Sequence, residues 1–238
     1  MKDARPGRAR RRRSKRARCD QLSFDRMRWG GERPGAGRKK VRGSGVSHRR
    51  RELLAPRFPV HVTLRLRAGL CSLRRGAAYH ALRIAFGRGR ERGGFRLVHY
   101  AVQSNHLHLI VEAKDRESLS RGMQGLAIRV ARALNRLWER GGSVFADRYH
   151  DRILRSPRQV RNALCYVLCN ASKHGLQLEP GMPDPFTSGD LFDGWRERPA
   201  EEPEVVAAGV VARARTWLAT KGWRRHGLLS FSEVPGRS

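Results

Sequence analysis

Residues 104–113 read SNHLHLIVEA, a pattern typical of a short β-strand. Alternate side chains of a strand point to opposite faces of its sheet. One face of this strand is aliphatic, with Leu107, Leu109 and Val111. The opposite face presents His106, His108 and Ile110. The aliphatic face predicts a buried core, whereas the two histidines on the other face require a separate explanation.

The segments around this strand alternate between strand and helix patterns. Strands are predicted at 58–67, 95–103 and 149–155 from their alternation of apolar and polar residues. Helices are predicted at 74–89, 119–137, 156–173 and 205–220. A strand, helix, strand, strand, helix, strand, helix order favours an antiparallel sheet packed with helices. The predicted fold class is therefore an α+β plait rather than a doubly wound parallel sheet.

The chain is strongly basic. Its 238 residues include 51 Lys and Arg against 21 Asp and Glu, a formal net charge of +30. Such a charge favours a polyanionic partner, either nucleic acid or an anionic membrane surface. No apolar run reaches the roughly 18 residues of a membrane span, and no apolar segment follows the basic N-terminus as in a secretory signal. We therefore expect a cytoplasmic, nucleoid-associated protein without a membrane partner.

The charge divides the chain into three parts. Residues 1–50 hold 19 Lys and Arg against 4 Asp and Glu, with few apolar residues, which predicts a disordered basic tail. Within this tail, Arg38, Lys39 and Lys40 are candidate DNA contacts. Residues 51–176 carry the periodic segments and form the predicted core domain. Residues 177–238 are predicted to be a partly helical accessory region.

The long helix predicted at 119–137 has an arginine stripe apart from its apolar stripe. The stripe contains Arg129, Arg132 and Arg136. Arginines on such a face are often simply solvated, but in a chain of this charge a groove for a nucleic-acid backbone is a fair alternative. We therefore include these three residues among the candidate DNA contacts.

The helix predicted to begin at Ser156 carries polar residues away from its apolar stripe. Tyr166 and Asn170 are four residues apart, so they are neighbours on one helical surface, together with Lys173, a further candidate DNA contact. Two imidazoles from the strand and an amide oxygen from this helix could hold one divalent cation. A tyrosine beside that cation is a candidate nucleophile towards a phosphate. The alternative is that the histidines are hydrogen-bonded structural residues and the tyrosine a packing residue.

NHLHLIV at 105–111, followed by ALCYVLCNASKHG at 163–175, resembles the REP-associated tyrosine transposases, single-tyrosine members of the HUH endonucleases. The resemblance covers about residues 56–176 and implies an RRM-like α+β core. It implies His106, His108 and Asn170 as ligands of Mg²⁺ or Mn²⁺, with Tyr166 as nucleophile. The implied substrate is single-stranded or hairpin DNA, cleaved through a 5′-phosphotyrosine intermediate. The family's usual Met-Pro before the strand is replaced by Gln103 and Ser104, and its Pro after the helix asparagine by Ala171.

Three other functions are alternatives to DNA cleavage. A catalytically silent DNA-binding protein derived from a transposase accounts equally well for the charge. A histidine-triad hydrolase needs a third histidine where Ile110 stands. An RNA-binding module on an RRM-like sheet needs stacking aromatic residues on the sheet face, and the predicted strands offer few. The sequence leaves open whether the protein is a monomer or a homodimer.

Overall fold

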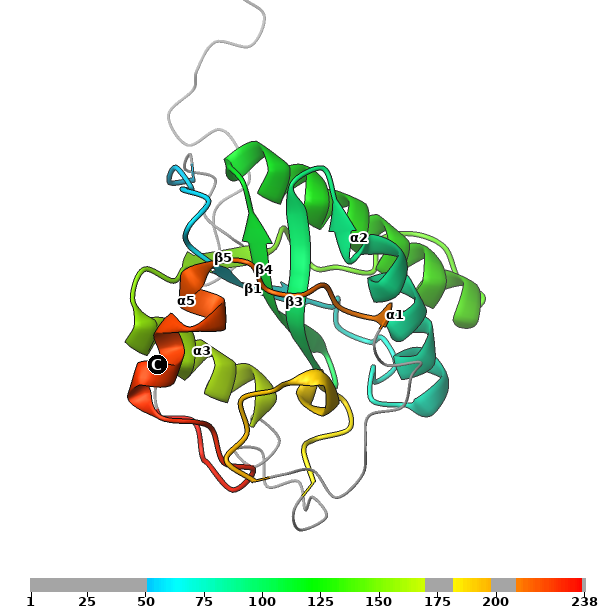
Figure 1. The fold of residues 1–238 in the computed structure, drawn as a ribbon. Coiled ribbons are helices and arrows are strands. Elements are labelled where there is room, and N and C mark those ends of the chain that lie inside the picture. Colours follow the sequence, from blue (N-terminus) through cyan, green and yellow to red (C-terminus); the bar gives the residue numbers. More distant parts are fainter. Residues whose placement is uncertain (1–50, 170–181, 198–208, 237–238) are drawn as a thin grey trace, which may run out of the picture. The chain divides into compact units, whose positions relative to one another are not determined.

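The protein contains a five-stranded antiparallel sheet covered by helices, seen in a computed structural model that describes residues 51–169, 182–197 and 209–236 (Figure 1). The strands are β1 (Val60–Arg65), β2 (Glu91–Arg92), β3 (Phe95–Val102), β4 (His106–Ala113) and β5 (His150–Ile153). Their order across the sheet is β2-β3-β4-β1-β5, which places β4 at the centre. The α-helices are α1 (Gly76–Gly89), α2 (Arg116–Leu137), α3 (Pro157–Leu168) and the short α5 (Trp217–Thr220). The predicted α+β class is confirmed.

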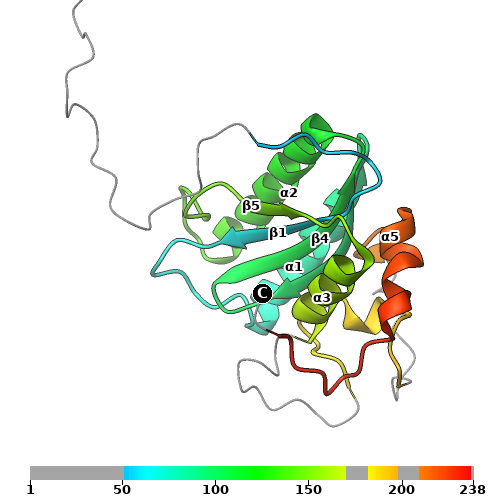
Figure 2. The same cartoon turned by 90° about the vertical axis from the view of Figure 1, so that its left-hand side faces the viewer.

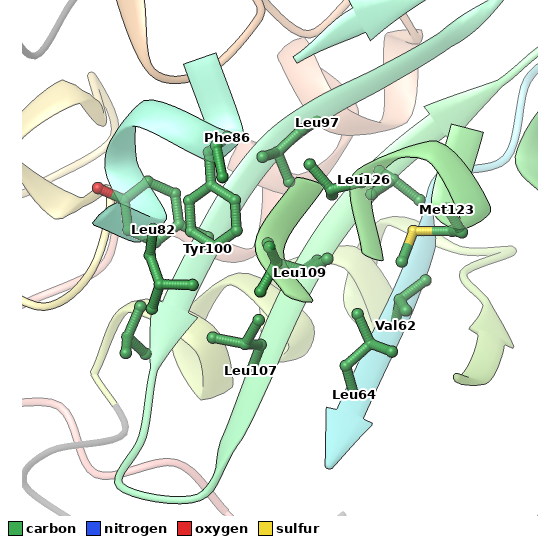
Figure 3. Close-up of a cluster of buried hydrophobic side chains, with 14 of the residues drawn as sticks. Val62, Leu64, Leu82, Phe86, Leu97, Tyr100, Leu107, Leu109, Met123 and Leu126 are labelled. Atoms are coloured by element: carbon green, nitrogen blue, oxygen red, sulfur yellow. The ribbon is translucent and has the colours of Figure 1, made fainter. Parts of the chain in front are cut away.

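The two faces of the sheet carry different layers. Helices α1 and α2 lie along one face, while α3 and α5 lie on the other (Figures 1 and 2). The larger core fills the space under α1 and α2 and includes the aliphatic face of β4 (Figure 3). A smaller core packs Ala101 and Ile110 of the opposite face against α3 and the C-terminal segment. In the described part of the chain, helices lie on both faces, so neither face is the fully open sheet surface on which an RRM stacks RNA bases.

The larger core shows why the alternating patterns specify this sheet. Val62 and Leu64 of β1 and Leu107 and Leu109 of β4 point to the same side, towards Met123 of α2 (Figure 3). All five side chains are at most 2% exposed. Burying a side chain of this size stabilises the fold by about 1.5–3 kcal/mol. A one-residue shift of the strand register would move these side chains to the other face of the sheet and would therefore destabilise the fold.

Local signals set the helix boundaries. Asp115 caps α2 by accepting a hydrogen bond from the backbone N–H of Ser118, and Ser156 caps α3 by accepting one from Gln159. Pro157 occupies the first turn of α3, where its missing N–H has no cost. Helix α2 can approach β3 closely because residue 122 is glycine: a Cβ there would lie 2.2 Å from the Phe95 ring.

Two helix predictions differ from the structure. Helix α3 ends at Leu168, with Cys169 as its C-cap, rather than near Lys173. Inside the helix predicted at 205–220, residues 211–216 are not helical and Trp217–Thr220 form a short helix, while residues 205–208 lie outside the described part of the chain. The reason is tertiary, because the N–H groups of Ala212 and Thr216 bond to Leu97 and Glu112 of the sheet instead of to a helical turn.

Glu112 of β4 anchors the C-terminal segment to the sheet. Its side chain is buried and accepts hydrogen bonds from the guanidinium of Arg96 at 3.0 and 3.1 Å. It also accepts the backbone N–H groups of Arg215 and Thr216 at 2.8–3.1 Å. A carboxylate with this many donors compensates for the loss of its hydration, and it joins two segments separated by about a hundred residues.

We expect Glu112→Ala to lower the free energy of unfolding by about 3–5 kcal/mol, because it leaves a guanidinium and two backbone N–H groups without their acceptor. Denaturant-induced unfolding monitored by circular dichroism measures this change. Glu91→Ala is the control, since Glu91 also pairs with Arg96 and Arg215 but is largely solvated, and we expect a loss of at most about 1 kcal/mol. Equal losses in the two variants would contradict the anchoring role of Glu112.

Candidate functional site

Two histidines of β4 face the α3 side of the sheet, as the alternation of the strand predicts. Antiparallel pairing with β1 places His108 opposite Thr63 and His106 opposite Arg65. His108 is buried, at 4% exposure, and His106 is half-buried at the end of the strand. The β3–β4 turn, closed by the N–H of Gln103 bonding to the carbonyl of His106, fixes where the strand begins.

The two imidazoles converge through the same ring atom. The Nε2 atoms of His106 and His108 lie 3.0 Å apart, and the rings are nearly perpendicular, at 87°. Both Nδ1 atoms point the other way and have partners of their own. His106 Nδ1 is 2.7 Å from the side-chain oxygen of Asn105, and His108 Nδ1 is 3.2 Å from the hydroxyl of Thr63. Where the partner of Nδ1 accepts, the proton of the imidazole lies on Nδ1 and Nε2 carries the lone pair.

This donor set fits a divalent cation. Two lone pairs 3.0 Å apart repel unless a proton or a cation lies between them. If two ligand atoms each lie about 2.1 Å from a cation and form a right angle at it, the two atoms are about 3.0 Å apart. Among the described residues, no group of three His, Cys, Asp or Glu side chains could hold a metal. His106 and His108 would therefore need further ligands, such as amide, water or phosphate oxygens.

A third histidine, which the sequence analysis did not select, lies beside the pair. His61 of β1 places its Nε2 atom 3.3 Å from Nδ1 of His108, and the two ring centroids are 5.3 Å apart. Burial lowers the pKa of His61 to about 4, helped by the charges of Arg152 and His150. The ring is therefore neutral at neutral pH and does not repel a cation. The alternation of β1 put His61 on a polar face, but only the register with β4 brings it to His108.

Tyr166 of α3 lies against the histidines. Its ring centroid is 4.9 Å from that of His108 and 5.7 Å from that of His61, both in edge-on arrangements. Tyr166 and His108 line a cavity of about 360 Å³ between β1, β5, α3 and the C-terminal segment. Its basic lining side chains include Arg152 and Arg161. The tyrosine, His108 of the histidine pair and a basic wall thus line one cavity that could accommodate a phosphate, and His106 contacts His108 beside it.

The other three tyrosines lie elsewhere. Tyr79, Tyr100 and Tyr149 pack against the larger core, on the α1 and α2 side of the sheet. Tyr149 is the other candidate for the nucleophile. The Cζ atom of the Arg51 guanidinium lies over its ring, 3.7 Å from the ring centroid. Burial raises the pKa of its hydroxyl, which disfavours the phenolate form. Of the four tyrosines in the chain, Tyr166 is the one that lines the histidine cavity.

The remaining site predictions fall in two groups. Asn170 and Lys173, like Arg38, Lys39 and Lys40, lie outside the described residues. Because α3 ends at Leu168, the predicted extension of this helix to Lys173 is wrong, and the placement of Asn170 one turn after Tyr166 stays a prediction. The three α2 arginines, Arg129, Arg132 and Arg136, lie on the helix that covers the opposite face of the sheet. The structure therefore does not bring them to the histidine cavity.

The comparisons with known proteins support the fold. No family model and no curated protein matches the sequence. One similar solved structure is a REP-associated tyrosine transposase bound to a REP hairpin, with a TM-score of 0.52 and 18% identity. The match covers 67% of this chain and 92% of that one. In the described part of the chain, no helix combines the length and apolarity that a membrane span requires. The chain thus shares the α+β fold of a hairpin-bound tyrosine transposase.

Proposed function

We propose that this protein cleaves and rejoins single-stranded or hairpin DNA through a covalent 5′-phosphotyrosine intermediate. The observation that carries the proposal is that the Nε2 atoms of His106 and His108 lie 3.0 Å apart, while the Tyr166 ring packs against His108 in a cavity that these last two residues line. The similar fold of a transposase bound to a REP hairpin supports the choice of DNA as substrate. The net charge of +30 supports a polyanionic partner.

In this proposal each residue has a defined task. His106 and His108 would hold Mg²⁺ or Mn²⁺, with Asn170 as the proposed third ligand, and the cation would supply polarisation of the scissile phosphate. The Tyr166 oxygen attacks phosphorus and loses its proton, forming a phosphotyrosine. The bond from phosphorus to the 3′ oxygen breaks, and that oxygen takes up a proton as a free 3′-hydroxyl. Asn105, Thr63 and neutral His61 orient the two histidines from behind.

The test is a search for the covalent adduct. The full chain is incubated with labelled stem–loop DNAs bearing single-stranded flanks, with Mn²⁺, Mg²⁺ or EDTA. We expect a protein–DNA adduct that survives denaturing electrophoresis, requires the metal and maps by mass spectrometry to the peptide containing Tyr166. Binding of the same DNAs without an adduct under either metal would favour the alternative, a catalytically silent DNA-binding protein derived from a transposase.

The basic tail is proposed to add affinity without taking part in cleavage. We expect deletion of residues 1–50 to leave the melting temperature of the remaining domain nearly unchanged, because the described elements begin after this segment. DNA affinity should fall, and the slope of log K against log salt should become shallower by about 0.7 per lost phosphate contact to a single strand. Thermal melting and a salt series of binding isotherms measure both. Unfolding of the truncated protein would contradict the domain boundary.

Arg129, Arg132 and Arg136 are proposed as backbone contacts remote from the cavity, because α2 covers the opposite face of the sheet. Lys173, Arg38, Lys39 and Lys40 are proposed contacts in the segments beyond the described elements. Such contacts position DNA and do not read its sequence.

A further inference from the structure

The cavity at Tyr166 has more room than one phosphate needs. Its volume of about 360 Å³ falls within the roughly 300–1,000 Å³ of small-molecule pockets. His108 and Tyr166 account for only part of its wall. If Tyr166 faces a phosphate in a DNA strand, as proposed above, a nucleotide next to that phosphate must lie in or beside the remaining space.

Part of the wall is apolar and buried. Leu154, directly after β5, is 1% exposed, and Ala163 of α3 is 7% exposed. Pro235 from the C-terminal segment is also buried and lines the same cavity. A flat nucleobase that leaves its stack loses apolar contact area, and a buried apolar wall restores part of it.

One amide on the same helix is placed to meet the polar edge of such a base. Asn162 precedes Tyr166 by four residues on α3, so their side chains are neighbours, and both line the cavity. Asn162 is exposed, and within the described residues its side chain has no hydrogen-bond partner. Gln159, the other amide in the lining, is already engaged, because its oxygen accepts the N–H of Arg155 at 2.7 Å.

The charges in the lining suit a sugar–phosphate backbone beside the base. Arg161 is neutralised by Glu233, with distances of 2.6 and 2.9 Å between guanidinium and carboxylate. Arg152 is exposed on β5, and no acidic side chain in the described segments forms an ion pair with it. Arg152 therefore supplies uncompensated positive charge to the cavity, while Asn162 supplies a neutral donor and acceptor.

We propose that this cavity binds the base of one unpaired nucleotide flanking the phosphate at Tyr166, and that Asn162 reads its edge. The inference rests on the proposed function for the position of the DNA strand. The proposal places the N7 edge of the base towards Asn162. On that edge the adjacent N6 donor and N7 acceptor of adenine match the acceptor and donors of an amide, whereas guanine presents two acceptors, O6 and N7. With this edge towards Asn162, adenine is the base that the amide selects.

A binding selection tests this inference without requiring cleavage. The full chain carrying Tyr166→Phe is mixed, in EDTA, with stem–loop DNA whose four-nucleotide flanks are randomised on both sides. Bound and unbound pools are then sequenced. We expect one flank position at which adenine is enriched about tenfold, the discrimination typical of a good bidentate contact. Adding Asn162→Ala should reduce that enrichment to about twofold or less and leave the other positions unchanged.

Two further variants make the outcome specific. Asn162→Asp replaces the donor with an acceptor of the same shape, so the preference at that position should move from adenine towards cytosine, whose N4 donates. Gln124→Ala removes an exposed amide from α2, on the other side of the sheet, and should leave the preference intact. Thermal melting verifies that the exposed helical substitutions keep the fold.

An adenine preference that survives Asn162→Ala would overturn the base pocket, as would a bound pool without any preferred flank position. Either result is compatible with a metal-dependent Tyr166 adduct, so the base pocket can fail while the proposed function stands. Conversely, an Asn162-dependent preference in a protein that never forms an adduct would support the pocket and refute only the catalytic proposal. Failure of the full chain to bind any of the DNAs would overturn both.

Discussion

Tyr166→Phe should eliminate the covalent protein–DNA adduct while leaving DNA binding within about twofold of the unsubstituted protein, because binding is expected to rest on many backbone contacts. The substitution removes one oxygen and preserves the ring that packs edge-on against His108 at 4.9 Å. Loss of the attacking atom removes the chemical step itself, so the adduct should fall below detection rather than decrease by a modest factor. Denaturing electrophoresis of labelled stem–loop DNA with Mn²⁺ measures the adduct, and a binding isotherm measures affinity.

Tyr149→Phe is the matched control, since it removes the same atom from a tyrosine that packs against the core on the opposite side of the sheet. It should form as much adduct as the unsubstituted protein. The mapped peptide is decisive: a phosphotyrosine at any position other than Tyr166 would refute the assignment. Persistence of the adduct in Tyr166→Phe would do the same.

His106→Ala combined with His108→Ala should reduce metal-dependent cleavage by about 100-fold or more, the scale of several kcal/mol of transition-state stabilisation. Their Nε2 atoms are 3.0 Å apart, so removing both eliminates the nitrogen ligands that this strand offers. DNA affinity should change little, because the arginines that surround the site remain. Cleavage rates are measured across a Mn²⁺ titration, together with the melting temperature.

The controls separate a metal role from a structural one. His80→Ala with His226→Ala removes two exposed imidazoles from α1 and from the 3₁₀ turn Gly222–His226, and cleavage should persist. His108 is buried, so a large drop in melting temperature in the double variant would indicate structural histidines instead. His106→Ala alone is the milder variant, because His106 is half-buried at the strand end. Unchanged cleavage and metal dependence in either variant would contradict the proposed metal site.

Glu112 shows how closely the candidate site and the C-terminal segment are connected. It lies on the same face of β4 as His106, His108 and Ile110, because the four residues are spaced by two along the strand. One face of one strand thus carries two histidines, a core residue and the anchor of Arg215 and Thr216. The C-terminal segment in turn supplies Glu233 and Pro235 to the wall of the cavity.

The sequence by itself determined the local structure and the facing of β4. Alternation of aliphatic and polar residues is a property of a single strand, and spacings of three and four are a property of a single helix. These local rules were sufficient to predict the α+β class, to place His106 and His108 away from the larger core, and to direct Tyr166 off the apolar stripe of α3. The roles assigned to these three residues remain predictions.

Only the tertiary structure decided what surrounds those side chains. The contacts of His61 and Thr63 with His108 depend on the register between β1 and β4. These contacts join residues 45 to 47 positions apart, and the sequence of either strand alone does not specify the register. The length of α3 was predicted incorrectly. The extended path of residues 211–216 was also predicted incorrectly, because helix propensity is weak and hydrogen bonds to the sheet prevail over it. The cavity that Asn162 and Tyr166 both line is bounded by β1, β4, β5, α3 and the C-terminal segment, so it exists only once these five parts of the chain have packed together.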